Sequence, residues 1–221
     1  MANPQSDRVV RGSDGVFRCR WGDSTPEYRT YHDSEWGLPV ADDVRLFEKL
    51  SLEGFQAGLS WLTILRKREA FREAFAGFDP ERVARFRERD VSRLLRDASI
   101  VRHRGKIEAV VNNAKRAIEL VEAEGSLAAY VWRFEPAEPE DRLEQAALRE
   151  RALTPESKAL ARDLKHRGWR FVGPTTVYAF MQAMGLVNDH VHGCDARDAV
   201  KRARAAFKRP RPSGTGDSYD G

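Results

Sequence analysis

The sequence predicts an all-α fold, and three of its features lead to that class. Apolar residues recur at the spacing of one helical face, among them Ile107, Val111, Ala114 and Ile118. Residues that start helices precede several segments of this kind. No segment shows the sustained alternation of apolar and polar residues, bounded by hairpin turns, that is typical of strands. With 221 residues, of which 41% are hydrophobic and 33% charged, the chain can bury a sizeable core.

The two ends of the chain differ in composition from the segment between them. Residues 1–16 and residues 205–221 lack apolar periodicity and are rich in proline, glycine, serine and charge, which is typical of flexible segments. We therefore predict a flexible extension over 1–16, a helical domain of two packed helical groups over 17–200, and a flexible basic tail over 201–221. The proline-containing stretch 135–141 is expected to connect the two groups.

A carboxylate interrupts the apolar face of the helix that we predict over residues 42–59. One face of this helix carries Leu46, Leu50, Glu53 and Ala57. An unpaired buried carboxylate is costly, so Glu53 needs a partner or a functional role in this position. The alternative is a glutamate at the edge of the apolar stripe, with its carboxylate in water.

Aromatic residues lie near this helix in the sequence: Trp21, Tyr28, Tyr31, Trp36 and Trp61. Aromatic faces beside a carboxylate suit a planar cationic base, because stacking, cation–π attraction and charge act together. Core packing explains such a cluster equally well. The residues alone leave both interpretations open.

Two residue pairs mark helix starts later in the chain. Asp79 before Pro80, and Thr154 before Pro155, each supply a side-chain acceptor at the N-cap and a proline in the first turn. Gly168 can end the helix that Thr154 begins. A further helix is indicated by apolar residues at helical spacing: Val177, Phe180, Met181 and Met184.

A helix–hairpin–helix is predicted between these two starts. Asp90 can cap a helix over 91–97, residues 98–104 form a short connection, and a second helix begins at Gly105. Backbone N–H groups at the start of that second helix can hold a DNA phosphate, with Gly105 permitting close approach. Flanking basic groups add a salt-sensitive attraction: Arg102, His103, Arg104 and Lys106. The usual hairpin has two glycines and this one has a single glycine, so a solvated basic turn is the alternative.

Two pairs of cysteine and histidine lie near opposite ends of the chain. Cys19 and His32 have the spacing C-x12-H. His190 and Cys194 have the spacing H-x3-C, which places both on one side of a helix or tight turn. Together the four would form a tetrahedral zinc site with no open position, and therefore a structural site that ties the chain ends. His192 competes with His190 as a ligand, and ordinary cysteines and histidines are the alternative to a metal site.

The net charge gives little support to nucleic-acid binding. It is +4, but residues 201–221 carry six of the 38 basic and two of the 34 acidic residues, which leaves 32 of each in residues 1–200. A DNA-binding prediction therefore rests on local clusters. No apolar stretch approaches the ~20 residues of a membrane span, and residues 1–15 lack the apolar core of a secretory signal. We expect a cytoplasmic protein, in which a disulfide between Cys19 and Cys194 is not expected.

Five segments and Cys194 together resemble the bacterial 3-methyladenine DNA glycosylase I family. They occur in the order typical of the family and cover roughly residues 17–195. The segments are Cys19-Arg20-Trp21, YHDSEWGLP over 31–39, LEGFQAGLSWLTIL over 52–65, IVRHRGKI over 100–107 and FVGPTTVYAFMQAMGLVNDH over 171–190. The longer termini of this chain depart from the compact form of the family.

The resemblance implies a helix–hairpin–helix glycosylase fold in which a structural zinc ion joins the N- and C-terminal segments. The zinc ligands of the family fall on Cys19, His32, His190 and Cys194. Its base pocket falls on Glu53, Tyr31 and Trp61, with Trp21 and Trp36 nearby. Its DNA-probing loop falls on Gly58 and Leu59, which would occupy the gap left by a flipped nucleotide.

The resemblance also implies an activity. The expected protein is a monofunctional base-excision repair glycosylase that hydrolyses the N-glycosidic bond of 3-methyladenine in alkylated double-stranded DNA and leaves an abasic site. Glu53 is the residue expected to take part in catalysis. Family members lack the aspartate that other helix–hairpin–helix glycosylases place after the hairpin, and residues 110–117 of this chain contain no acid. We expect a monomer in the cytoplasm, associated with the nucleoid.

Two other functions are compatible with the same scaffold. One is a DNA-binding protein without catalytic activity, although phosphate binding alone needs none of Glu53, Tyr31 and Trp61. The other is a glycosylase of the same fold with a different base preference.

Overall fold

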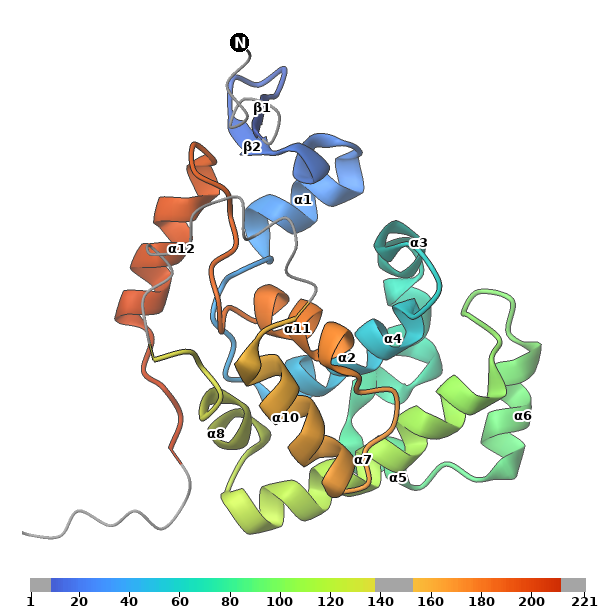
Figure 1. The fold of residues 1–221 in the computed structure, drawn as a ribbon. Coiled ribbons are helices and arrows are strands. Elements are labelled where there is room, and N and C mark those ends of the chain that lie inside the picture. Colours follow the sequence, from blue (N-terminus) through green and yellow to red (C-terminus); the bar gives the residue numbers. More distant parts are fainter. Residues whose placement is uncertain (1–8, 138–152, 212–221) are drawn as a thin grey trace, which may run out of the picture.

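The computed structural model describes residues 9–137 and 153–211, and these form a helical molecule with one short β-hairpin (Figure 1). The first part comprises β1 (Val9–Arg11), β2 (Phe17–Cys19), a 3-10 turn (Arg20–Asp23), α1 (Pro26–Ser34), α2 (Asp43–Gln56), α3 (Trp61–Arg66) and α4 (Arg68–Ala74). There follow a second 3-10 turn (Ala76–Phe78), α5 (Pro80–Ala84), α6 (Glu88–Arg96), α7 (Arg104–Glu124) and α8 (Leu127–Trp132). The last part comprises α10 (Pro155–His166), α11 (Pro174–Ala183) and α12 (Asp195–Ala206). The predicted helical class is confirmed.

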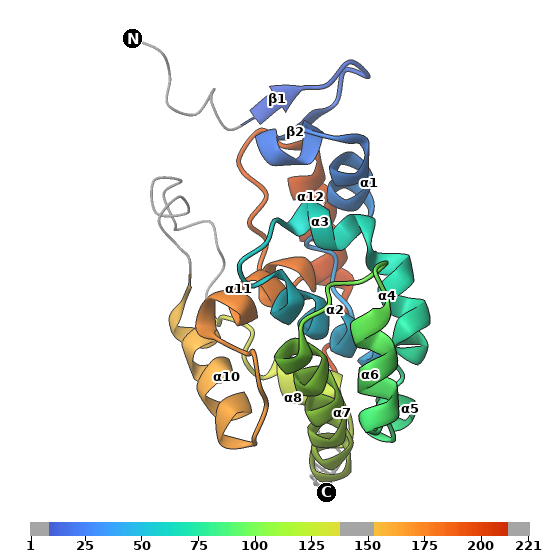
Figure 2. The same ribbon diagram turned by 90° about the vertical axis from the view of Figure 1, so that its right-hand side faces the viewer.

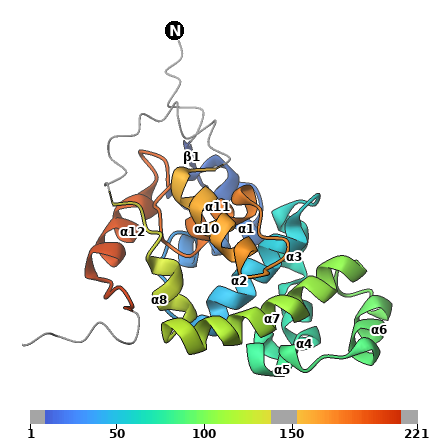
Figure 3. The same cartoon turned by 60° about the horizontal axis from the view of Figure 1, so that its bottom comes forward.

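Helix α2 lies at the centre of this structure, with α7, α8 and α11 packed against it (Figures 1 and 3). All residues from Leu46 to Phe55 are buried, so the helix is enclosed on every side. The core around it includes large, fully buried aromatic side chains, among them Phe71, Phe75 and Phe78. Helix α2 nevertheless carries charged residues in its buried stretch: Glu48, Lys49 and Glu53. Each of these needs a partner inside the fold.

The N-terminal hairpin and the C-terminal helix lie side by side (Figures 1 and 2). Strands β1 and β2 pair antiparallel, with Val10 opposite Arg18, and α12 packs beside β2. The Phe17 N–H donates a hydrogen bond to the Asp195 carboxylate at the start of α12, at 2.8 Å. This contact brings Cys19, at the end of β2, close to Cys194, the residue that precedes α12.

The hairpin differs from the flexible extension that we expected over 1–16. Arg18 is 3% exposed, and its guanidinium pairs with Asp14 at 2.7 Å and with Asp33 at 2.8 Å. These ion pairs fold the turn back onto α1, with Gly15 at a φ of +83° that suits glycine. Strands of three residues are too short to give an alternating pattern, so the sequence does not reveal them. Residues 1–8 of the expected extension lie outside the described residues.

The C-terminal segment is also more ordered than the flexible tail that we expected over 201–221. Helix α12 continues to Ala206. Beyond it, Arg209 pairs with Glu135 at 2.8 Å, and Arg204 of α12 pairs with the same carboxylate at 3.0 Å. A distant acidic partner thus anchors a segment whose own composition suggests flexibility. Residues 212–221, and 138–141 of the expected connection, lie outside the described residues, and the division into two helical groups stays a prediction.

Two of the predicted helix starts are confirmed in atomic detail. The Asp79 carboxylate accepts from the Glu81 N–H at 2.9 Å, and the Thr154 hydroxyl accepts from the Ser157 N–H at 3.2 Å. Gly168, two residues after the end of α10, has a φ of +81°, as the predicted helix end requires.

The start of α6 differs from our prediction. The helix begins at Glu88 rather than after Asp90. The Asp90 carboxylate reaches back and accepts from the Arg87 N–H at 2.9 Å. Asp90 is therefore the third residue of the first turn, where a carboxylate caps the helix from inside. The hairpin itself is confirmed, since α6 ends at Arg96 and α7 begins at Arg104.

Candidate functional site

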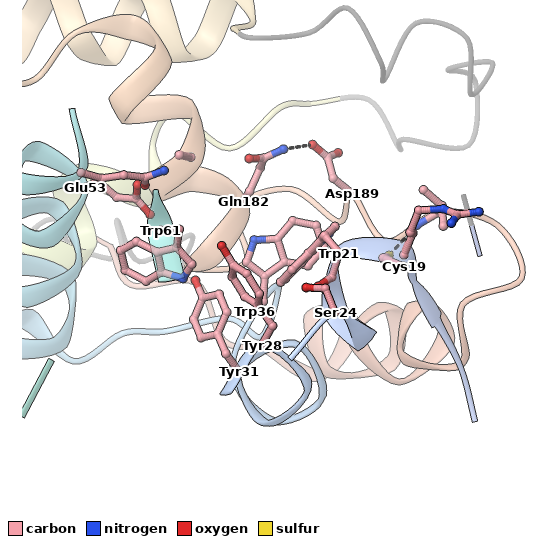
Figure 4. Close-up of a pocket in the computed structure, with 14 residues that line it drawn as sticks. Cys19, Trp21, Ser24, Tyr28, Tyr31, Trp36, Glu53, Trp61, Gln182 and Asp189 are labelled. Carbon is pink, nitrogen blue, oxygen red and sulfur yellow. Dashed lines mark hydrogen bonds between the residues drawn. The ribbon is translucent and has the colours of Figure 1, made fainter. Parts of the chain in front are cut away.

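A cavity of about 800 Å³ lies between the N-terminal segment, α2, α3 and α11 (Figure 4). Its aromatic lining residues are Trp21, Tyr28, Tyr31, Trp36 and Trp61. Its polar lining residues include Ser24, Glu53, Gln56, Gln182 and Asp189. An aromatic wall with a few polar groups suits a small flat molecule that also forms hydrogen bonds. The cavity brings together all five residues that we assigned to a base pocket.

Glu53 lies on α2 and is 5% exposed, with a buried lysine as its partner. Its Oε1 atom is 2.8 Å from Nζ of Lys49, which lies one helical turn earlier and is 2% exposed. This pairing explains how α2 tolerates a carboxylate in its buried stretch. Our sequence analysis missed Lys49. The signal that would have found it is the four-residue spacing to Glu53, which places a cation on the same helical face.

The same ammonium contacts the other two residues of the predicted pocket. Lys49 Nζ donates a hydrogen bond to the Tyr31 hydroxyl oxygen at 2.7 Å. It also lies 3.3 Å from the centroid of the Trp61 ring. The rings of Tyr31 and Trp61 are 5.5 Å apart and tilted by 48°. One buried cation thus joins α1, α2 and α3 behind the cavity.

Burial controls the ionisation of this group of residues. The pKa of Lys49 is lowered to about 8, chiefly by burial and also by the nearby Arg68, while the charges of Glu53 and Glu35 oppose this fall. Burial also raises the pKa of Tyr31 well above its ordinary value, and the charges of Glu53 and Glu35 add to that rise. At neutral pH, Lys49 is therefore mostly a charged ammonium and Tyr31 an uncharged phenol.

The tryptophans and Tyr28 form one wall of the cavity. The Trp21 ring meets Trp36 edge to face at 5.0 Å and Tyr28 at 5.6 Å. The Tyr28 hydroxyl accepts a hydrogen bond from the Leu62 N–H at 3.0 Å, which holds the start of α3 in place. The indole N–H of Trp61 is buried and has no hydrogen-bond partner among the described residues. A buried donor of this kind is a feature of sites that bind a polar ligand or ordered water.

A polar cluster that the sequence did not indicate lies across the cavity. The Asp189 carboxylate accepts a hydrogen bond from the Gln182 amide at 2.7 Å (Figure 4). It accepts a second one from the Tyr178 hydroxyl at 2.5 Å. Asp189 directly precedes His190, and Gln182 lies on α11. The cluster ties the segment that follows α11 to that helix, and so fixes the position of His190.

The predicted metal ligands form one buried cluster. The ligand atoms of Cys19, His32, His190 and Cys194 all lie within 4.8 Å of one another. The Cys194 sulfur is 3.5 Å from His32 Nε2 and 3.5 Å from His190 Nδ1. The Cys19 sulfur is 3.8 Å from His190 Nδ1. Tetrahedral zinc, with bonds of ~2.3 Å to sulfur and ~2.0 Å to nitrogen, places such atoms about 3.5 Å apart. The donor set fits that ion.

The surroundings of the cluster also suit a structural metal. His32 Nδ1 is 2.8 Å from the Asp33 carboxylate, and His190 Nε2 is 3.0 Å from the Trp36 carbonyl oxygen. Such contacts on the outer ring nitrogen orient a histidine ligand. Hydrogen bonds from Cys19, His190 and His32 lower the pKa of the Cys194 thiol, and the thiolate is the form that binds metal. No disulfide joins the cysteines, and the competing residue, His192, is exposed and outside the cluster.

The predicted probing loop connects α2 to α3 beside the cavity. Gly58 has a φ of +82°, and Leu59 is 43% exposed, so an apolar side chain projects from a tight turn. The Lys106 ammonium donates to the carbonyl oxygens of Phe55 at 2.9 Å and Ala57 at 2.5 Å. Lys106 belongs to α7, so its side chain ties the loop to the first turn of that helix.

This position of Lys106 differs from the role that we expected for it. Its side chain is 7% exposed and points into the protein, because the carbonyl groups at the end of α2 attract a cation. Arg102, His103 and Arg104 are exposed. His103 caps α7 through a hydrogen bond from the Lys106 N–H to its ring nitrogen at 3.2 Å. The hairpin therefore presents three basic or polar side chains, and Gly105, but not the Lys106 ammonium.

One exposed aromatic residue beside the hairpin was missed. Phe171 is 41% exposed, has a φ of +56° and lies 6.3 Å from the His103 ring. A non-glycine residue in this conformation is uncommon. Nothing in the sequence pattern predicts that conformation, because it depends on the packing of the loop before α11.

The described residues contain no helix that is long and apolar enough to cross a membrane.

Comparison with known proteins shows which families and proteins this chain is similar to. The methyladenine glycosylase family model matches residues 21–198. DNA-3-methyladenine glycosylase 1 of Escherichia coli (strain K12) is 48% identical over 177 residues, which cover 80% of this chain and 95% of that protein. DNA-3-methyladenine glycosylase of Haemophilus influenzae is 43% identical over 180 residues, which cover 81% of this chain and 97% of that one.

Solved structures give the same result. A crystal structure of 3-methyladenine DNA glycosylase I matches with a TM-score of 0.73 and 46% identity over 81% of this chain and 99% of that one. A variant of 3-methyladenine DNA glycosylase I crystallised in complex with 3-methyladenine matches with a TM-score of 0.73 and 38% identity over 81% of this chain and 97% of that one.

Proposed function

The chain belongs to the methyladenine glycosylase family, and we propose that it excises 3-methyladenine from alkylated double-stranded DNA by hydrolysing the N-glycosidic bond. The observation that carries the proposal is the buried Glu53 carboxylate beside an aromatic cavity of about 800 Å³. The enzyme is monofunctional: water displaces the base, no lysine nucleophile is needed, and an abasic site remains.

The chemistry follows from the lesion. Methylation at N3 leaves adenine cationic in DNA, so the damaged base is already a good leaving group. The base must leave the duplex to reach the cavity, and a weakly paired base lowers the cost of a few kcal/mol. Once there, Trp61 and Tyr31 offer aromatic surface to a planar cation. The Glu53 carboxylate supplies negative charge and hydrogen-bond acceptors for the amino group of adenine.

Glu53 is the residue to which we assign a catalytic role. Cleavage of the glycosidic bond leaves an oxocarbenium-like sugar, whose charge a nearby carboxylate and the DNA phosphates stabilise. Helix α2 is enclosed by the core, so the carboxylate is held rigidly and needs little reorganisation during the reaction. Trp21 and Trp36 complete the wall and exclude water from the bound base.

We assign DNA binding to the loop between α2 and α3 and to the hairpin between α6 and α7. Leu59 would enter the gap left by the extruded nucleotide, as apolar wedges do in proteins that bend and unstack DNA, with Gly58 supplying the turn. The Arg104 and Gly105 N–H groups, at the first turn of α7, would bind a phosphate. Arg102, His103 and Arg104 would add attraction that weakens with salt. The Lys106 side chain instead supports the loop.

We assign a structural zinc ion to Cys19, His32, His190 and Cys194. With four protein ligands no position remains for a reacting water. The metal would hold β2 and α1 to the segment before α12. It would thereby fix Tyr31, the neighbour of His32, and Trp36, whose carbonyl oxygen contacts His190. The monomeric state and the cytoplasmic, nucleoid-associated location stay predictions.

The proposal is tested by incubating the protein with methylated duplex DNA and separating the released bases by chromatography. We expect free 3-methyladenine, little 7-methylguanine, and abasic sites whose strands break only after alkali. Release of a different alkylated base would favour the glycosylase with another preference. Tight DNA binding without any base release would favour the non-catalytic DNA-binding protein.

A further inference from the structure

The buried Lys49 lies behind the cavity and touches the three residues that form its reactive end. Its Nζ atom is 2.8 Å from Glu53 Oε1, 2.7 Å from the Tyr31 hydroxyl oxygen and 3.3 Å from the Trp61 ring centroid. The three partners line the cavity and Lys49 does not. It therefore acts on a bound base only through them.

An ammonium has three N–H donors and no acceptor. Lys49 has one partner for each donor: a carboxylate oxygen, a phenol oxygen and an aromatic face. The arrangement satisfies the buried cation completely, as a charge in a protein core requires. It also determines which donor and acceptor atoms of Tyr31 and Glu53 remain available to a ligand in the cavity.

Two consequences follow for the cavity. Because the Tyr31 oxygen accepts from Lys49, its own proton is free to be donated elsewhere. Because Oε1 of Glu53 faces Lys49, and no other hydrogen bond from the described residues reaches this carboxylate, Oε2 remains an acceptor. At this end of the cavity Tyr31 thus offers a donor and Glu53 an acceptor.

We propose that Lys49 is a positioning residue that sets the hydrogen-bond polarity of the pocket, and through it the preference for adenine over guanine. The proposal rests on the proposed function. Adenine presents an amino donor next to a ring-nitrogen acceptor, whereas guanine presents two acceptors, O6 and N7, on the corresponding edge. Acceptor Glu53 and donor Tyr31 match adenine. They oppose guanine, whose O6 would face a carboxylate.

The test uses Glu53→Gln with and without Lys49. A glutamine side chain offers an oxygen acceptor and an NH₂ donor. Beside Lys49, which can only donate, the amide must turn its oxygen to the ammonium and its NH₂ to the cavity. That NH₂ opposes the amino group of adenine. In Lys49→Met/Glu53→Gln the amide is free to turn, and its oxygen can face the base again.

Binding of free 3-methyladenine at pH 7, followed by calorimetry or by tryptophan fluorescence, gives the readout. We expect Glu53→Gln to lose affinity by roughly tenfold or more, and the double variant to regain at least about fivefold of that loss. A residue needed only for packing would make the double variant bind more weakly than Glu53→Gln. Equal or weaker binding by the double variant would overturn the proposal. No binding by the native protein would instead refute the proposed function.

A second measurement needs no change at Lys49. With Lys49 present, Glu53→Gln presents an NH₂ group to the cavity, so its affinity for free 3-methylguanine, whose N7 carries no methyl group, should rise by about tenfold or more relative to 3-methyladenine. An unchanged ratio would contradict the proposal even if the Lys49 variants fail to fold. Lys115→Met, at an exposed position of α7, is the matched control, and its binding of both bases should equal that of the native protein.

Discussion

The tether between α7 and the predicted probing loop at Gly58 and Leu59 can be removed by a single substitution, Lys106→Met. Methionine keeps most of the length and apolar volume of the lysine side chain but lacks its ammonium. The change leaves the carbonyl oxygens of Phe55 and Ala57 without the donor that lies 2.9 Å and 2.5 Å away. Those groups lie at the end of α2, the helix that carries Glu53, and they are four and two residues before Leu59.

The magnitude follows from these contacts. A hydrogen bond from a charged group contributes roughly 1.5–3 kcal/mol, so two would give about 3–6 kcal/mol. Burial of the ammonium offsets part of this gain, and its effect is seen in the lowered pKa of Lys106. We therefore expect a net loss of about 2 kcal/mol in the free energy of unfolding. For a chain of this size that corresponds to a fall in melting temperature of roughly 4–8 °C.

Thermal unfolding and single-turnover excision together test this reasoning. Because the loop loses its anchor, excision from duplex DNA should fall about tenfold, whereas binding of free 3-methyladenine should change by less than about twofold. Lys115→Met serves as control and should alter stability by less than about 0.5 kcal/mol. A Lys106→Met protein that melts like the control and excises at the native rate would refute the tether.

Three other perturbations have defined outcomes. Leu59→Ala shortens a side chain that is 43% exposed, so the melting temperature should fall by less than about 2 °C while single-turnover excision falls about tenfold; native excision would rule out a wedge. Metal analysis should find one zinc per chain and none in Cys194→Ser, and a chelator should lower the melting temperature of the native protein alone; a metal-free native protein of unchanged stability would disprove the zinc assignment. Burial lowers the pKa of Lys49 from 10.5 to about 8. Below pH 8 the buried ammonium is charged and destabilises the folded protein most. Between pH 8 and 10.5 the unfolded chain holds a proton on Lys49 that the folded chain has released. Denaturant unfolding should thus show native stability rising relative to Lys49→Met/Glu53→Gln by up to about 3 kcal/mol over this range, and parallel pH curves would contradict it.

The sequence predicts those parts of the molecule that depend on local rules. Helix starts at Asp79 and Thr154 follow from a side-chain acceptor and a proline that act within one turn. Residue type indicates Cys19, His32, His190 and Cys194 as candidate zinc ligands, and the family resemblance favours this set over ordinary cysteines and histidines. The contact between Phe17 and Asp195, which brings the chain ends together, cannot be read from either segment alone.

Other features depend on partners that are distant in the sequence. The hairpin over 9–19 is stabilised by Arg18 and its pairing with Asp33, and its strands are too short to show a period. Lys106 has the residue type and place of a phosphate ligand, yet the carbonyl groups at the end of α2 hold its ammonium. Lys49 was overlooked because a lysine in an amphipathic helix usually faces solvent, and only the enclosure of α2 on every side makes it a buried residue.

Release of bases from methylated duplex DNA, compared under single-turnover conditions for the native protein and Glu53→Gln, tests the central claim most directly. The native protein should release 3-methyladenine and little 7-methylguanine. Glu53→Gln, folded as judged by circular dichroism, should release 3-methyladenine at least about 100-fold more slowly. Equal rates in the two proteins would contradict the role of Glu53, and a native protein that releases no base would contradict the assignment as a glycosylase.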